Sequence, residues 1–117
     1  MGKSNRMRKS TTQVTSHILY AGPFSVDLDS HTAMYHGKEL PLPHCVFNTL
    51  VTLIRNSPHP VSYQDLILES QGLRLGRLDA QDLARCRIYL LRKAIELNLQ
   101  APQHIRAVAG FGYRMII

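Results

Sequence analysis

The side chains best suited to chemistry in this sequence are the arginines and the lysine between residues 78 and 99. Four apolar residues recur there at steps of four, three and four, as on one stripe of a 3.6-residue helix: Ala84, Ile88, Leu91 and Ile95. The opposite side carries Asp82, Cys86, Tyr89 and Lys93, and its edge carries Arg85 and Arg92. A helix with a buried stripe and a basic edge, followed by a glycine-containing hairpin, suggests an element presented to a polyanion.

The basic charge is concentrated in the last third of the chain. The 117 residues carry a formal net charge of +6. Residues 17–73 have a net charge of −3, whereas residues 74–117 hold eight basic and three acidic side chains, a net charge of +5. Such a segment is expected where a chain meets phosphate, although a solvated basic face without a partner explains the charge alone equally well.

Composition predicts one domain preceded by an arm. Residues 1–16 have a net charge of +4 and little to bury, so we expect a flexible basic arm, with a solvated tail or interdomain linker as the alternative. Residues 17–117 are long enough for a single domain with one modest core.

Several classes of protein find little support. Cys45 and Cys86 lack the spacing of a metal or disulfide framework, and reduced thiols suit the cytoplasm. The glycines at 110–112 are followed by no helix, so they are not a dinucleotide fingerprint. No apolar run approaches the roughly 20 residues of a membrane span. We therefore expect no enzyme, no cofactor, no metal, and a cytoplasmic, nucleoid-associated protein.

The first half of the chain predicts short strands and then two helices. Turn residues punctuate residues 17–42, and Phe24, Val26 and Leu28 alternate with polar residues, which indicates three or four short antiparallel strands. A helix is predicted over 43–56 with Pro43 in its first turn. Val61 is a short bridging strand, and Ser62 to Asp65 has the form of a capping box that opens a helix to about residue 70.

The second half predicts a loop, a long helix and a hairpin. Residues 71–77 form the loop, the helix covers about 79–98, and strands at 104–109 and 113–117 join through Gly110 to Gly112. Strands, two helices, a third helix and a hairpin wing, in that order, describe an α+β fold: a winged helix-turn-helix with an N-terminal antiparallel sheet, three helices and a C-terminal β-hairpin wing.

Two motifs carry a resemblance to a known family. They are Ile88-x-x-Leu91-Arg92-Lys93 and Ile105-x-x-Val108-x-Gly110-Phe111-Gly112-Tyr113-Arg114. In this order and spacing the chain, from about residue 18 to 117, resembles the OmpR/PhoB-type winged-helix DNA-binding domain of bacterial transcriptional regulators. The resemblance implies that the third helix enters the major groove and that the wing, residues 105–117, reaches the adjacent minor groove. It also implies RNA polymerase contact through loop 71–77 and homodimers on direct repeats.

The resemblance and the helical pattern together nominate nine DNA-binding residues: Arg85, Cys86, Arg87, Tyr89, Leu90, Arg92, Lys93, Arg106 and Arg114. By the resemblance, Cys86 and Leu90 fall at base-reading positions and Arg92 at a phosphate-contacting position. The sequence also departs from the family pattern. Leu90 and Ala109 replace common arginines, Arg85 stands in place of a usual aspartate, and Arg87 in place of a frequent histidine.

Sequence-specific binding of double-stranded DNA in bacterial transcriptional regulation is the function predicted from these residues. The alternative is a winged-helix protein-interaction module with weak or no DNA binding. A second apolar stripe motivates that alternative: Leu83, Cys86, Leu90, Ala94 and Leu97. Each arginine has a simpler interpretation as a solvated or ion-paired surface residue, and Arg114 as a residue that braces the hairpin.

Overall fold

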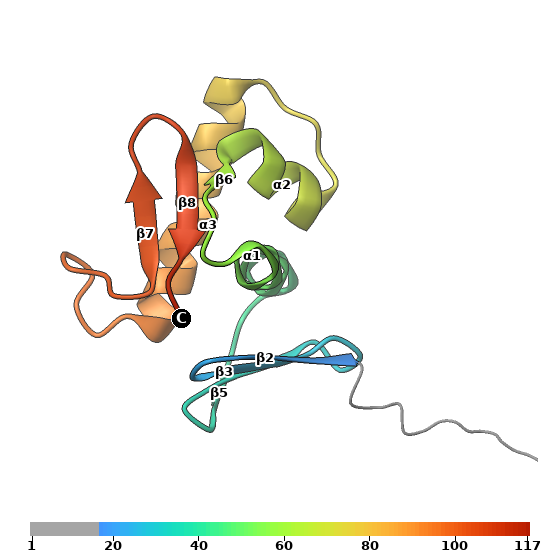
Figure 1. Ribbon diagram of the computed structural model, residues 1–117. Coiled ribbons are helices and arrows are strands. Elements are labelled where there is room, and N and C mark those ends of the chain that lie inside the picture. The colour runs from blue at the N-terminus through green and yellow to red at the C-terminus, as the bar shows by residue number, and fades with distance from the viewer. Residues whose placement is uncertain (1–16) are drawn as a thin grey trace, which may run out of the picture. The chain divides into compact units, whose positions relative to one another are not determined.

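The computed structural model describes residues 17–117 (Figure 1). The predicted basic arm, residues 1–16, lies outside the described residues. The chain divides into a unit that ends at Glu39 and a second unit, Leu40–Ile117, and each is described by itself. That residues 17–117 act as one domain stays a prediction.

The first unit is built from a meander of short strands. β2 (Ile18–Ala21), β3 (Phe24–Asp27) and β4 (Thr32–Tyr35) pair antiparallel, and β5 (Lys38–Leu40), which runs into the second unit, completes the order β2-β3-β4-β5. Along β3, buried side chains alternate with half-buried polar ones, as the period of two predicts. His36 and Gly37 both have positive φ, 51° and 80°, which is typical of a tight hairpin turn and places one before β5.

Three helices form the core of the second unit. They are α1 (His44–Asn56), α2 (Tyr63–Gln71) and α3 (Arg77–Ile95). Their facing sides bury Leu50, Leu53, Leu66, Ile67, Ile88 and Leu91 almost completely. Pro43 lies one residue before α1 rather than in its first turn, because its carbonyl already accepts hydrogen bonds from the N–H groups of Val46 and Phe47.

α2 is capped at both of its ends. The Ser62 hydroxyl accepts a hydrogen bond from the Asp65 N–H at 3.1 Å, as the capping-box pattern predicts. α2 ends at Gln71, where Gly72 adopts a φ of 73° and its N–H donates to the Leu68 carbonyl. Gln71 and Arg77 are therefore helical, and the connecting loop is shorter than predicted, residues 72–76.

α3 is also shorter at its C-terminus than the predicted range of about 79–98. It covers Arg77–Ile95, and Glu96 leaves the helix with a ψ of 132°. The Glu96 side chain then accepts hydrogen bonds from the backbone of residues 103–105, which draws the chain away from the helix axis. Leu97 consequently lies beyond α3, fully exposed, so the second apolar stripe expected on this helix ends at Ala94.

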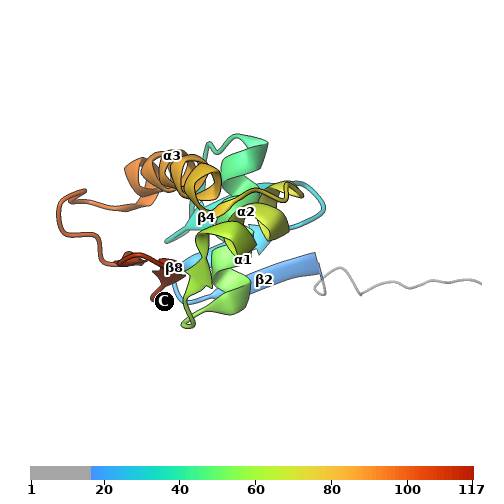
Figure 2. The ribbon, with the colours of Figure 1, turned by 90° about the horizontal axis from the view of Figure 1, so that it is seen from above.

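The wing is part of a three-stranded sheet. β6 (Val61–Ser62), β7 (Ile105–Val108) and β8 (Gly112–Met115) lie in the order β6-β8-β7. The segment after α3 makes a wide excursion before it enters β7, which is visible in the two perpendicular views of Figure 1 and Figure 2. Gly112 belongs to β8 rather than to the turn, and a Cβ there would lie 1.8 Å from the Val61 carbonyl oxygen of β6. Only glycine allows this approach, so the wing stays joined to the α1–α2 connection.

Candidate nucleic-acid interface

The exposed side of α3 collects most of the residues nominated from the sequence. α3 buries Ala80, Ala84, Ile88, Leu91 and Ile95 against the other helices. The opposite side, here called the α3 face, exposes Arg85, Cys86, Tyr89, Leu90 and Lys93. Tyr89 and Leu90 are 54% and 42% exposed, which is high for residues of their type. The observed exposure thus confirms the outward side of α3 that the helical period predicts. That side combines cations with apolar surface.

The two cations of the α3 face are only loosely engaged. An Arg85 Nη atom lies 3.6 Å from an Asp82 carboxylate oxygen one turn earlier, and the Lys93 Nζ lies 5.4 Å from the Tyr89 ring centroid. An exposed ion pair contributes about 0–1 kcal/mol and an exposed cation–π contact about 0.5–1 kcal/mol. Both side chains can therefore leave these contacts and bind a polyanion at a small cost in free energy.

Arg87 and Arg92 lie at the edges of α3 and are half-buried. The Nε atom of each is buried and has no hydrogen-bond partner within residues 17–117. Arg92 donates from Nη2 to the Ile105 carbonyl at 2.9 Å, and its guanidinium lies 5.7 Å from the Tyr113 ring centroid. The arginine expected at phosphate is thus engaged with the strands of the wing.

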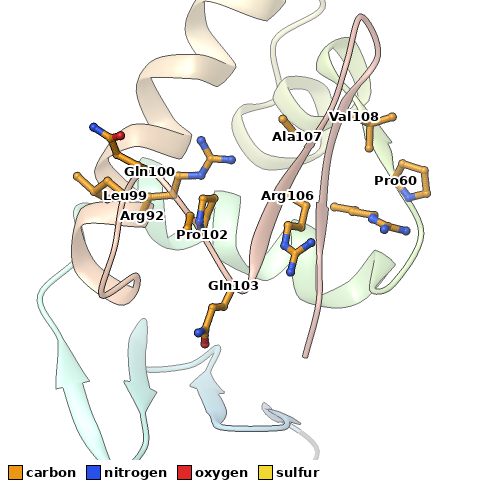
Figure 3. A pocket seen from close by; sticks show the side chains of 11 residues that line it. Pro60, Arg92, Leu99, Gln100, Pro102, Gln103, Arg106, Ala107 and Val108 are labelled. Carbon is orange, nitrogen blue, oxygen red and sulfur yellow. The ribbon is translucent and has the colours of Figure 1, made fainter.

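The wing supplies two further cations. Arg106 of β7 and Arg114 of β8 face each other in the register and are both exposed. Like charges directly opposite on neighbouring strands destabilise a hairpin, so an anion between or beside them would relieve the repulsion. With Arg92 they line an open groove beside the hairpin, shown in Figure 3. Its other walls come from Pro60 and from the segment that leads from α3 into β7.

Glu96 was missed by sequence reasoning, because an acid after the last turn of a helix has no distinguishing pattern. Its carboxylate accepts three backbone hydrogen bonds, and its effect depends on residues that follow the helix. Elsewhere in residues 17–117, no three His, Cys, Asp or Glu side chains are grouped so as to hold a metal ion. No helix among these residues has both the length and the apolar character needed to span a membrane.

A helix-turn-helix whose second helix is exposed, followed by a β-hairpin, defines a winged-helix domain. The chain belongs to the OmpR/PhoB-type DNA-binding domains, since residues 37–115 match the family model described as transcriptional regulatory protein, C terminal. The family and the fold expected from the two motifs are both confirmed.

Curated relatives and solved structures agree with this assignment. The chain is 32% identical over 98 residues to the DNA-binding dual master transcriptional regulator RpaA of Synechocystis, covering 84% of this chain and 40% of RpaA. It is 28% identical over 105 residues to the sensory transduction protein RegX3 of Mycobacterium leprae, covering 89% and 52%. The chain therefore spans about half or less of the length of these relatives.

Among solved structures, the Klebsiella pneumoniae RstA DNA-binding domain in complex with RstA box has a TM-score of 0.73 at 21% identity, covering 84% of this chain and 95% of that one. The DNA-binding domain of Escherichia coli CpxR has a TM-score of 0.70 at 23% identity, with coverages of 84% and 94%. At these identities the likeness establishes the fold.

Proposed function

We propose that this chain binds double-stranded DNA sequence-specifically and so regulates transcription, with α3 in the major groove and the wing at the adjacent minor groove. The carrying observation is that the α3 face and the two wing arginines are exposed within one compact unit. The major groove, about 12 Å wide, admits an α-helix. The RstA DNA-binding domain, which has the same fold, was solved in complex with RstA box, and this supports DNA binding by the fold.

The proposed roles follow from side-chain chemistry. Arg85, Arg106 and Arg114 donate to phosphates, which supplies most of the affinity. Lys93 donates either to a phosphate or to a guanine, and Tyr89 and Leu90 contact thymine methyl groups. By position, Cys86 also faces the bases, while Arg87 and Arg92 lie at the margins of the interface.

The first experiment is selection of bound duplexes from a random pool, followed by anisotropy titrations on the enriched site. We expect Lys93→Ala to weaken binding by about 1–3 kcal/mol if Lys93 reads a base, and to relax selectivity at that position. Arg55→Ala is the matched control, because Arg55 is an exposed cation at the end of α1. Equal losses for the two variants would contradict the proposed interface, and failure of any duplex to be enriched would contradict the function.

The alternative, a protein-interaction module, is favoured by the exposed leucines near the end of α3. Leu90, Leu97 and Leu99 all expose a large part of their side chains. Sedimentation at increasing salt separates the two functions. DNA binding weakens steeply with salt, whereas apolar association between protein chains does not. Salt-independent self-association without DNA affinity would establish the alternative.

Two further partners and a cellular location belong to the same proposal. RNA polymerase is proposed to contact the predicted loop 71–77, of which residues 72–76 are non-helical and expose Leu73 beside Arg74. Two copies are proposed to bind direct repeats as a homodimer, and the bound protein is then cytoplasmic and nucleoid-associated. DNA titrations with one and two half-sites measure the second point directly.

A further inference from the structure

Glu96 makes an unusual set of contacts at the end of α3. Its Oε1 accepts a hydrogen bond from the Gln103 N–H at 2.8 Å. Its Oε2 accepts hydrogen bonds from the N–H groups of His104 and Ile105, each at 2.9 Å. Three successive backbone donors thus converge on one carboxylate, as in the anion-binding nests of other loops.

These contacts do not serve α3, the helix that ends just before Glu96. A negative charge at a helix C-terminus faces the negative end of the macrodipole and is unfavourable there by itself. The favourable partners of the carboxylate all lie on the segment that enters β7. The function of Glu96 is therefore to fix where that strand begins.

Arg92, one turn earlier on α3, acts on the same strand. Its Nη2 donates to the Ile105 carbonyl at 2.9 Å, while its guanidinium lies over the Tyr113 ring of β8. The N–H of Ile105 is consequently held by Glu96, the residue that follows α3, and its carbonyl is held by Arg92 of α3. In Figure 3, Arg92 comes from α3, and Arg106 follows on the strand that begins at Ile105.

The geometry points to Glu96 and Arg92, here called the Glu96–Arg92 clamp, as positioning residues for DNA binding. The clamp fixes the wing relative to α3, so that Arg106 and Arg114 meet the backbone while the α3 face lies in the groove. This inference rests on the proposed function. It assigns Arg92 to holding the wing rather than to a phosphate.

The test compares Glu96→Gln with Glu69→Gln in binding a short mixed-sequence duplex at low salt, below the unfolding transition of every variant. Each substitution removes one negative charge, which by itself favours DNA binding slightly. Glu69 lies on α2 and accepts a single long hydrogen bond, 3.3 Å, from Asn56. A glutamine at 96 has only one side-chain oxygen, so its NH₂ group faces at least one of the three backbone N–H donors and the clamp is weakened.

We expect Glu96→Gln to weaken binding on the order of tenfold and to lower the salt slope by about 2, the value for two lost phosphate contacts. Glu69→Gln is expected to bind as tightly as the unmodified chain or slightly more tightly. Equal affinities for the two variants would overturn the inference while leaving the proposed function in place. An unmodified chain that binds no duplex would overturn both.

A double-mutant cycle separates positioning from general loss of stability. In a chain that already carries Arg106→Ala and Arg114→Ala, Glu96→Gln should cause almost no further loss, because the groups it positions are absent. An undiminished loss in that background would show that Glu96 does not act through the wing arginines.

Discussion

Tyr89 and Leu90 give the centre of the α3 face an apolar character, and this has a consequence for the bases it selects. If a thymine methyl group packs on Leu90, its removal should cost about 0.8 kcal/mol of binding free energy, which is roughly a fourfold loss of affinity. We therefore expect replacement of thymine by uracil at the contacted positions of the selected site to weaken binding by that factor in anisotropy titrations. In Leu90→Ala the same replacement should have little effect. If the two proteins lose affinity equally, Leu90 is not the contact.

Burial of Tyr113 predicts a pH dependence of stability. Its pKa is raised above the ordinary value of 10.0, mainly by burial, with Arg92 opposing the shift and Tyr63 adding to it. Above pH 10 the unfolded chain loses this proton first, so the free energy of unfolding declines as pH rises toward the folded pKa. We expect Tm to fall more steeply above pH 10 in the unmodified chain than in Tyr113→Phe. Parallel curves would show that other groups govern alkaline unfolding.

The close approach of β6 to Gly112 predicts that even a single added methyl group at this position lowers stability. A Cβ at this position would meet the backbone of Val61 and Ser62, which cannot move aside as a flexible side chain can. Gly112→Ala should lower the free energy of unfolding by about 1–3 kcal/mol, measured by urea denaturation. Gly76→Ser, at the N-terminus of α3, has open space around it and should change stability by a few tenths of a kcal/mol in the favourable direction. Similar results for both variants would contradict the close β6–β8 approach.

Sequence reasoning predicted the exposure of individual residues correctly where the 3.6-residue period of a helix is enough to determine it. Arg85, Tyr89 and Lys93 are exposed because the apolar stripe fixes the rotation of α3. It could not foresee the engagement of Arg92, whose partner Ile105 lies on a strand thirteen residues further along the chain. The predicted roles of all nine nominated residues in DNA contact remain predictions.

At the scale of elements, α2 depends on a single capping side chain. Ser62→Ala removes the acceptor of the Asp65 N–H and should cost about 1 kcal/mol of stability, visible as a lower Tm. Ser62→Asp retains an acceptor at the same place and should restore most of the loss. If Ser62→Ala is neutral, the Asp65 N–H finds water as an equivalent partner.

Most elements could be predicted, but several of their ends could not. Periodicity identified the strands, the three helices and the hairpin, because hydrophobic spacing is a local property. The end of α3 was placed too late, since residues 96–99 contain no helix breaker. Its real end is set by Glu96 and the backbone of residues 103–105, which are tertiary contacts. The boundary between Gly112 and the turn was missed for the same reason.

At the scale of the whole molecule, the distribution of cations predicts how strongly salt should weaken binding. If Arg85, Lys93, Arg106 and Arg114 each neutralise one phosphate, the plot of log affinity against log salt has a slope of about −3.6. Alanine at any one of the four should reduce the magnitude of the slope by about 0.9. A slope near zero for the unmodified chain would leave the basic surface without a role in binding.

The strand order β6-β8-β7 places β8, which is made late, between two strands made earlier. Val61 and Tyr113 are neighbours in the sheet although α2 and α3 separate them in sequence. During synthesis, therefore, the helices can emerge and pack while the sheet still lacks its middle strand, β8. The wing cannot be completed, and binding competence cannot begin, until residues 112–115 have left the ribosome.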